Sequence, residues 1–103
     1  VVARWNDPDH LRRQVAKYKG QIAAIIFEPI MCNTCCMEPV PGMIETIREL
    51  CDREGMLMIA DETITGFRFG PGGAQKHVRR TAAPAAEAAP AVCRTRPNPG
   101  KGR

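Results

Sequence analysis

Aromatic residues are scarce in this chain, and long apolar runs are missing. Phe, Trp and Tyr make up 5% of the 103 residues. No stretch approaches the roughly 20 consecutive apolar residues that a membrane-spanning helix needs. A chain of this length has room for one small domain at most, which excludes a complete large enzyme. It opens on Val1 with no initiator Met and no signal peptide, so we expect an internal part of a longer protein without membrane contact.

An even set of cysteines is also missing. The chain has five, and the motif Cys32-x-x-Cys35-Cys36 has no second Cys-x-x-Cys or His pair at zinc-finger spacing. A metal site at this motif would need a fourth ligand, for which the candidates are Cys51, His10 and His77. We favour the alternative of small apolar loop residues with reduced thiols, no bound metal and a cytoplasmic location.

The apolar segments that are present alternate with amphipathic ones. Residues 22–27 and 56–60 are short, continuous apolar runs, as expected for parallel strands covered on both faces. Between them, residues 43–54 carry apolar side chains at helical spacing, and Gly55 supplies the helix end. The order predicts an α/β fold with one parallel β-α-β unit.

A second helix is predicted before this unit, over residues 8–19. Asn6-Asp7-Pro8 is typical of a helix start, and Leu11 and Val15 recur at helical spacing. Two helices are too few to cover a two-stranded sheet on both faces, so we expect apolar surface to remain exposed in the isolated chain.

Two carboxylates stand where the predicted strands end. Glu28 follows the first run and Asp61 the second, and ligands of open α/β sheets bind just past the carboxyl ends of such strands. The pair suits acid/base chemistry, or recognition of a cation or protonated ring, and each residue could instead only cap a turn. The loop from 29 to 41 is long for a β-α-β unit and carries Asn33, which favours a functional role.

Several motifs in this order resemble the central part of class III pyridoxal-phosphate-dependent aminotransferases. The similarity runs from about Trp5 to His77, and a match of several motifs in order is more specific than any one of them. The motifs are Ile26-Phe-Glu-Pro29, Pro41-Gly-Met43, Leu50-Cys-Asp-Arg-Glu-Gly55 and Ile59-Ala-Asp-Glu-Thr-Ile-Thr-Gly-Phe-Arg-Phe-Gly70. Pro71-Gly-Gly-Ala-Gln75 and the opening Trp5-Asn-Asp7 lean towards the glutamate-1-semialdehyde aminomutase-like branch.

The resemblance implies that residues 1–77 are a fragment of the large domain of a fold-type I transferase. In the family, the residue matching Asp61 pairs with the pyridine nitrogen of the cofactor and holds it protonated. Thr63 stands where the family usually has a Val against the ring face. Asn33 matches an Asn near the ring hydroxyl, and Glu28 matches the Glu of the family's Glu-Pro.

The same resemblance shows what is absent. The family needs a Schiff-base lysine downstream of Asp61, and the only lysines there are Lys76, which follows too soon, and Lys101, which lacks the family's setting. The upstream glycine-rich phosphate-binding loop is missing too. The chain is therefore expected to hold part of a pyridoxal phosphate site and to be inactive alone, whereas the parent would be a homodimer acting on a small amino acid or amino-aldehyde.

From Val78 the composition changes to Ala, Pro and Arg with almost no large apolar residue, which predicts a disordered basic tail over residues 78–103. One interpretation is that the tail is a frameshift product. Family members often continue with Phe-Gly-Val at this point, and when the codons for Phe-Gly-Val are read one nucleotide early they can encode the Val-Arg-Arg of 78–80. The formal net charge of +4 lies largely in this tail.

A small binding module with a basic arm for nucleic acid or an acidic partner is the alternative function, although no aromatic residue is interleaved for base stacking.

Overall fold

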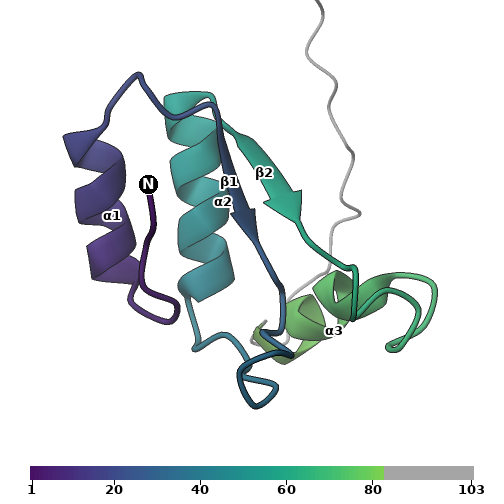
Figure 1. The fold of residues 1–103 in the computed structure, drawn as a ribbon. Helices are drawn as coiled ribbons and strands as arrows, with labels where there is room; N and C mark the ends of the chain where they lie inside the picture. The colour runs from purple at the N-terminus through teal and green to yellow at the C-terminus, as the bar shows by residue number, and fades with distance from the viewer. Residues whose placement is uncertain (83–103) are drawn as a thin grey trace, which may run out of the picture.

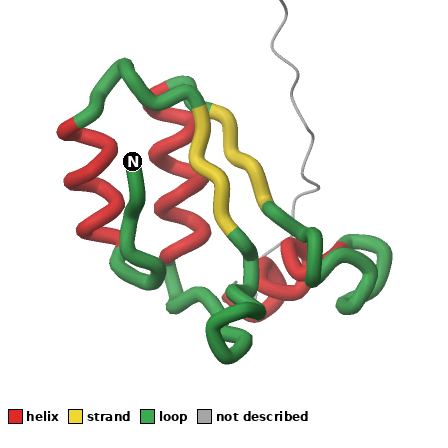
Figure 2. The backbone as a smooth tube through the Cα atoms, in the orientation of Figure 1, coloured by secondary structure: helices red, strands yellow, loops and turns green. Residues whose placement is uncertain are grey.

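The computed structural model describes residues 1–82, and residues 83–103 lie outside the described part. The elements follow the order α1 (Pro8–Lys17), β1 (Ala24–Phe27), α2 (Met43–Glu54), β2 (Leu57–Ala60) and α3 (Gly73–Ala82). In Figures 1 and 2, α1 lies beside α2, α2 lies next to the two strands, and α3 lies beyond the ends of the strands. Within the described residues no helix is long and apolar enough to cross a membrane.

The two strands pair in parallel, so the predicted β-α-β unit is confirmed. Ala24 is opposite Leu57 and Phe27 is opposite Ala60. The Asp61 N–H donates to the Phe27 carbonyl oxygen over 2.8 Å, which continues the pairing one residue past β2. Each strand is shorter than its predicted run, because Ile22, Ala23 and Met56 lie outside the paired residues 24–27 and 57–60.

The predicted stripe of α2 forms the centre of the core. Met43, Ile47 and Leu50 are buried and pack with Leu11 and Val15 of α1. The helix ends as expected, because the Gly55 N–H donates to the Cys51 carbonyl and Gly55 takes the left-handed φ of 70°. This stripe therefore joins both helices to one face of the sheet.

Helix α1 begins where the sequence predicts and ends slightly earlier. The Asp7 carboxylate accepts a hydrogen bond from the His10 N–H over 2.8 Å, and Pro8 occupies the first turn, where its missing N–H costs nothing. The helix ends at Lys17 rather than at 19, and the chain then turns through Gly20, whose φ is 76°.

The other face of the sheet stays bare within the described residues. Ile26 is 68% exposed and Leu57 is 67% exposed, whereas Ile25 and Met58, which alternate with them, pack on the core. The expectation of exposed apolar surface is confirmed.

Helix α3 was not predicted, and it corrects the start assigned to the basic tail. Val78 is 3% exposed and packs with Ile30 and Ala74 in a second small core, so the fold continues past residue 77 and the helix runs to Ala82. Composition alone missed it because a single Val at helical spacing from Ala74 is a weak periodic pattern. The remainder of the predicted tail, residues 83–103, lies outside the described residues.

The long loop between β1 and α2 is tied to the N-terminal segment by one side chain. The Asn6 amide donates to the Glu38 carbonyl, and its oxygen accepts from the Val40 N–H, both over 2.9 Å. Asn6 itself has φ 59°, which Asn tolerates better than most residues. This pair of bonds holds the later part of the loop near the start of α1.

Candidate functional site

A small pocket lies at the carboxyl ends of the two strands, and the four residues selected from the sequence line it. Its volume is about 170 Å³, and Glu28, Asn33, Asp61 and Thr63 share its wall with Ile64 and Thr65. Parallel pairing explains this meeting, because it brings the residues that follow β1 and β2 to the same edge of the sheet.

Asp61 is held in one orientation by the turn that follows β2. Its Oδ1 accepts the Thr63 N–H over 2.9 Å and the Thr63 hydroxyl over 2.6 Å. These two hydrogen bonds, the hydroxyl bond first, lower the pKa of Asp61 below its usual value of 3.8 despite partial desolvation. Oδ2 accepts no hydrogen bond from the described residues, so this carboxylate presents one oxygen to a ligand.

The hydroxyl of Thr63 already has a hydrogen-bond partner within the pocket. Its hydroxyl donates to Asp61, which leaves the methyl group of the β-branched side chain as the part that can face a ligand. The extra hydroxyl that distinguishes Thr63 from a Val therefore contacts the carboxylate at the strand end.

Glu28 and Asn33 also line this pocket. Glu28 is half-buried and Asn33 is exposed. Neither side chain forms a hydrogen bond to any described residue, which leaves both available to a bound molecule. Arg68 does not pair with Glu28 or Asp61, because its Nε donates to the Ile64 carbonyl over 2.7 Å.

Sequence reasoning missed Glu62, which connects this pocket to α3. Its carboxylate oxygens accept the N–H groups of Ala74 over 3.0 Å and Gln75 over 2.9 Å, and the buried Thr65 hydroxyl also donates to it. Burial raises the pKa of Glu62, but the hydrogen bonds outweigh burial and leave it below the usual value of 4.5. No local pattern could have found this contact, since Glu62 lies 12 residues before Ala74.

Gly73 is needed where Glu62 meets α3. Its φ is 60°, and a Cβ built on it would come within 2.6 Å of a Glu62 carboxylate oxygen. Any larger residue would therefore meet both an unfavourable backbone conformation and a steric clash. The carboxylate at the start of α3 also suits the positive end of the helix dipole.

The cysteine motif forms a tight loop beside the pocket. Met31 and Met37 exchange two backbone hydrogen bonds, of 3.1 and 3.2 Å, and all three cysteines lie between them as free thiols. Within residues 1–82 no group of three or more His, Cys, Asp or Glu side chains could hold a metal ion, so the metal alternative finds no ligand set there.

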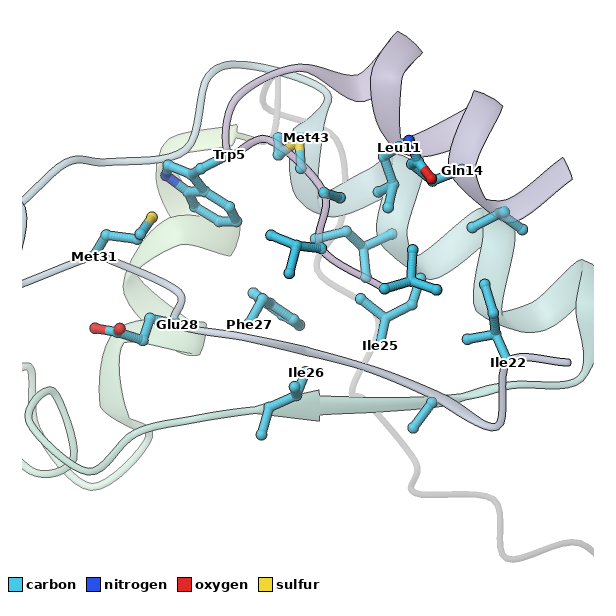
Figure 3. A pocket seen from close by; sticks show the side chains of 16 residues that line it. Trp5, Leu11, Gln14, Ile22, Ile25, Ile26, Phe27, Glu28, Met31 and Met43 are labelled. Atoms are coloured by element: carbon cyan, nitrogen blue, oxygen red, sulfur yellow. The ribbon is translucent and has the colours of Figure 1, made fainter. Parts of the chain in front are cut away.

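A second, larger pocket of about 420 Å³ lies along β1 and the N-terminal segment. Figure 3 shows its apolar wall, with Trp5, Ile25 and Phe27 turned towards one another and Glu28 at one end. The rings of Trp5 and Phe27 stack with centroids 6.3 Å apart. Its lining is mostly aliphatic and aromatic, so the polar groups suited to chemistry lie in the smaller pocket. No described lysine lines either pocket.

These features define an α/β strand-helix-strand unit with an acidic pocket where the strands end. The family model for aminotransferase class-III matches residues 6–83, and the chain belongs to this family. A curated relative, glutamate-1-semialdehyde 2,1-aminomutase of Salinibacter ruber (strain DSM 13855 / M31), is 46% identical over 76 residues, which are 74% of this chain and 17% of the relative. The resemblance stated from the sequence motifs is confirmed.

A solved structure shares the fold. A protein described as a transaminase with PLP bound matches 85% of this chain and 19% of its own, with a TM-score of 0.70 and 25% sequence identity. The predicted α/β class, as a portion of a pyridoxal-phosphate-dependent transferase fold, is confirmed. The chain spans less than a fifth of the length of either protein.

Proposed function

We propose that this chain is part of an enzyme that uses pyridoxal phosphate to transfer an amino group, or to shift it within a molecule, on a small amino acid or amino-aldehyde. The observation that carries the proposal is the pocket at the strand ends, where Thr63 holds Asp61 by two hydrogen bonds and no described residue bonds its Oδ2. Membership of the class-III aminotransferase family and the names of the two similar proteins support the choice of cofactor.

The residues of the pocket fit the cofactor's ring. When bound, pyridoxal phosphate supplies a protonated ring that accepts electrons from the substrate carbon bearing the amino group. Asp61 would accept a hydrogen bond from the ring nitrogen at Oδ2 and keep that nitrogen protonated. A carboxylate with a lowered pKa suits this part, because it stays charged at neutral pH.

The neighbouring side chains have separate parts in this proposal. Thr63 fixes Asp61 through its hydroxyl and offers its methyl group to the ring face. Asn33 would bond the ring hydroxyl, as the family resemblance implies, and it has no competing partner among the described residues. Glu28 would contribute charge at the pocket wall, where the half-buried carboxylate can meet the substrate's amino group.

The isolated chain is expected to be inactive, because no described lysine reaches the pocket. Mixing the 103-residue chain with pyridoxal phosphate, reducing with borohydride and mapping peptides should give no stoichiometric label on Lys76 or Lys101. Specific labelling of either lysine would show that this chain carries its own covalent cofactor site, and the interpretation as an incomplete site would be wrong.

The decisive experiment for the function is to sequence the DNA on both sides of the coding region. We expect a glycine-rich phosphate-binding sequence upstream and a lysine downstream, in this or another reading frame. In the full-length product, Asp61→Ala should lower kcat by at least about a hundredfold, because the charge opposite the ring is lost. Asp61→Glu should retain part of the activity. Flanks without either sequence, or an unchanged Asp61→Ala enzyme, would overturn the proposal.

We also propose a homodimeric parent in the cytoplasm. The homodimer follows from the family resemblance, and the bare apolar face around Ile26 and Leu57 supports further covering structure in the parent. Free thiols at Cys32, Cys35 and Cys36 favour a reducing compartment. The alternative of a nucleic-acid or acidic-partner module stays a prediction, because most of its basic arm lies outside the described residues.

A further inference from the structure

The loop between Met31 and Met37 brings two thiols together beside the candidate pocket. Met31 and Met37 exchange both backbone hydrogen bonds, which makes them a narrow antiparallel pair. Cys32 and Cys36 are the next residues inside this pair. As a hydrogen-bonded antiparallel pair, Met31 and Met37 have Cα atoms about 5.5 Å apart, within the span of about 4.4–6.8 Å that disulfides bridge, and the turn that holds Cys32 and Cys36 begins and ends at this pair.

The conformation of the loop turns Cys36 back onto Cys32. Cys35 and Cys36 have φ values of 63° and 52°, so two consecutive left-handed residues reverse the chain direction. The Cys36 Sγ lies 4.0 Å from the Cys32 carbonyl oxygen. Loss of solvation raises the pKa of the Cys32 thiol, and the charge and hydrogen bond of Cys36 raise it further. Cys35 forms no hydrogen bond with either thiol in the described structure.

We propose that Cys32 and Cys36 are a redox pair, a modification site at which a small hydroperoxide forms an intraloop disulfide. The two cysteines differ in exposure, because Cys36 is exposed and Cys32 is partly covered by Ile30 and α3. Cys36 reacts first and Cys32 completes the bond.

The chemistry balances in two steps. The Cys36 thiolate attacks the distal oxygen of the hydroperoxide, which breaks the O–O bond, releases the alcohol and leaves Cys36 as a sulfenic acid. The Cys32 sulfur then attacks the Cys36 sulfur and water leaves with the hydroxyl oxygen. Two thiols lose two electrons and two protons, and the hydroperoxide is reduced to alcohol and water. A dithiol reductant reverses the step by thiol exchange, which returns two electrons and two protons to Cys32 and Cys36 and leaves the reductant as a disulfide.

The disulfide would act on the candidate pocket through Asn33. This residue follows Cys32 directly and lines the same pocket as Asp61. Closing the bond between Cys32 and Cys36 constrains the backbone on both sides of Asn33, so the oxidised loop presents a different pocket wall. This consequence rests on the proposed function, whereas the disulfide itself does not.

The test maps which cysteines pair in the full 103-residue chain. A Cys93→Ser variant, fully reduced, is treated with a small excess of hydrogen peroxide, blocked with N-ethylmaleimide and digested with trypsin. The peptide of residues 20–48 contains Cys32, Cys35 and Cys36. We expect it to lose two hydrogens and to carry maleimide on Cys35 alone, as read by tandem mass spectrometry. Maleimide on all three cysteines, or a disulfide that includes Cys35, would overturn the proposal.

Matched variants separate native geometry from mere nearness in sequence. Cys35→Ser should form the disulfide as fast as the parent chain, and Cys36→Ser should lose it. In concentrated urea the preference for Cys32 with Cys36 should disappear. If Cys36→Ser pairs Cys32 with Cys35 equally fast, or if urea changes nothing, the folded loop does not direct the reaction and the proposal fails.

An amide spectrum of the ¹⁵N-labelled chain tests the effect on the pocket. Oxidation should shift the Asn33 and Glu28 amide resonances while those of Leu11 and Val15 in α1 stay in place. A disulfide without these shifts would refute the link to the pocket. None of these readouts needs pyridoxal phosphate, so their failure is distinguishable from failure of the flanking-sequence test.

Discussion

The two halves of this molecule are held together by different forces. The helix–sheet half, α1, β1, α2 and β2, is stabilised by apolar side chains such as Leu50, which is 0% exposed. The carboxyl-end half, residues 28–42 and 61–78, has only the small core of Ile30, Ala74 and Val78, and it depends more on side chains that bond distant backbone groups, as Asn6 and Glu62 do. Three of the four non-glycine residues with positive φ, Cys35, Cys36 and Phe67, lie in the second half. Periodic burial builds a scaffold, and specific polar contacts shape the site on its edge.

The largest expected effect tests the apolar half. Leu50→Ala removes a fully buried side chain from the contact between α2 and the sheet, and should lower the free energy of unfolding by about 2–5 kcal/mol. Urea denaturation followed by circular dichroism measures it. Leu57→Ala, at a 67% exposed position of the same type, should change the free energy by about 0.5 kcal/mol or less. Equal losses would mean that this half is not organised around the α2 stripe.

The next effect belongs to the polar half. Glu62→Ala leaves the Ala74 and Gln75 amides without their acceptor, and should cost about 1 kcal/mol, concentrated in α3. Hydrogen exchange of these amides measures the local loss. Glu45→Ala is the matched control, because it removes an acidic residue from the first turn of α2 that accepts no hydrogen bond from a described amide. If Glu45→Ala lowers amide protection in α2 as much as Glu62→Ala does in α3, the loss would come from the charge at the helix dipole and not from the hydrogen bonds of Glu62.

Acid should loosen the polar half before it affects the apolar half. The folded-state pKa of Glu62 is lowered, so its stabilisation of α3 is complete above the usual value of 4.5 and is lost as pH falls through the lower, folded value. The Ala74 and Gln75 amide resonances should titrate below pH 4.5 and should stop doing so in Glu62→Ala. A transition above 4.5 in these amides would contradict the lowered pKa.

The smallest effect concerns a single hydrogen bond in the pocket. Thr63→Val removes the hydroxyl that donates to Asp61 and should raise the pKa of Asp61, whereas Thr63→Ser should keep it near the original value. The ¹³C resonance of the Asp61 carboxyl group, followed against pH, measures the shift. The backbone N–H of Thr63 still donates in both variants, so the change is partial. Identical titrations in Val and Ser variants would assign the lowered pKa to the backbone bond alone.

The sequence determined the scaffold and four of the six residues that line the pocket. The spacing of Met43, Ile47 and Leu50 specifies a helical face, and the continuous apolar runs on either side specify the two strands, although one face of their sheet is exposed in this chain. Parallel pairing then brings Glu28 and Asp61 to one edge. The family motifs added Asn33 and Thr63, and the structure places all four around one pocket.

Tertiary structure alone decided how the site is held. The sequence gives no sign that Glu62 bonds the start of α3, or that Val78 is buried, because both contacts join residues far apart in the chain. Nor does spacing reveal that the Thr63 hydroxyl points to Asp61 or that Cys36 folds back onto Cys32. Hydrogen bonds depend on the direction of individual groups, whereas apolar burial depends only on which face a residue occupies, and periodicity encodes only the latter.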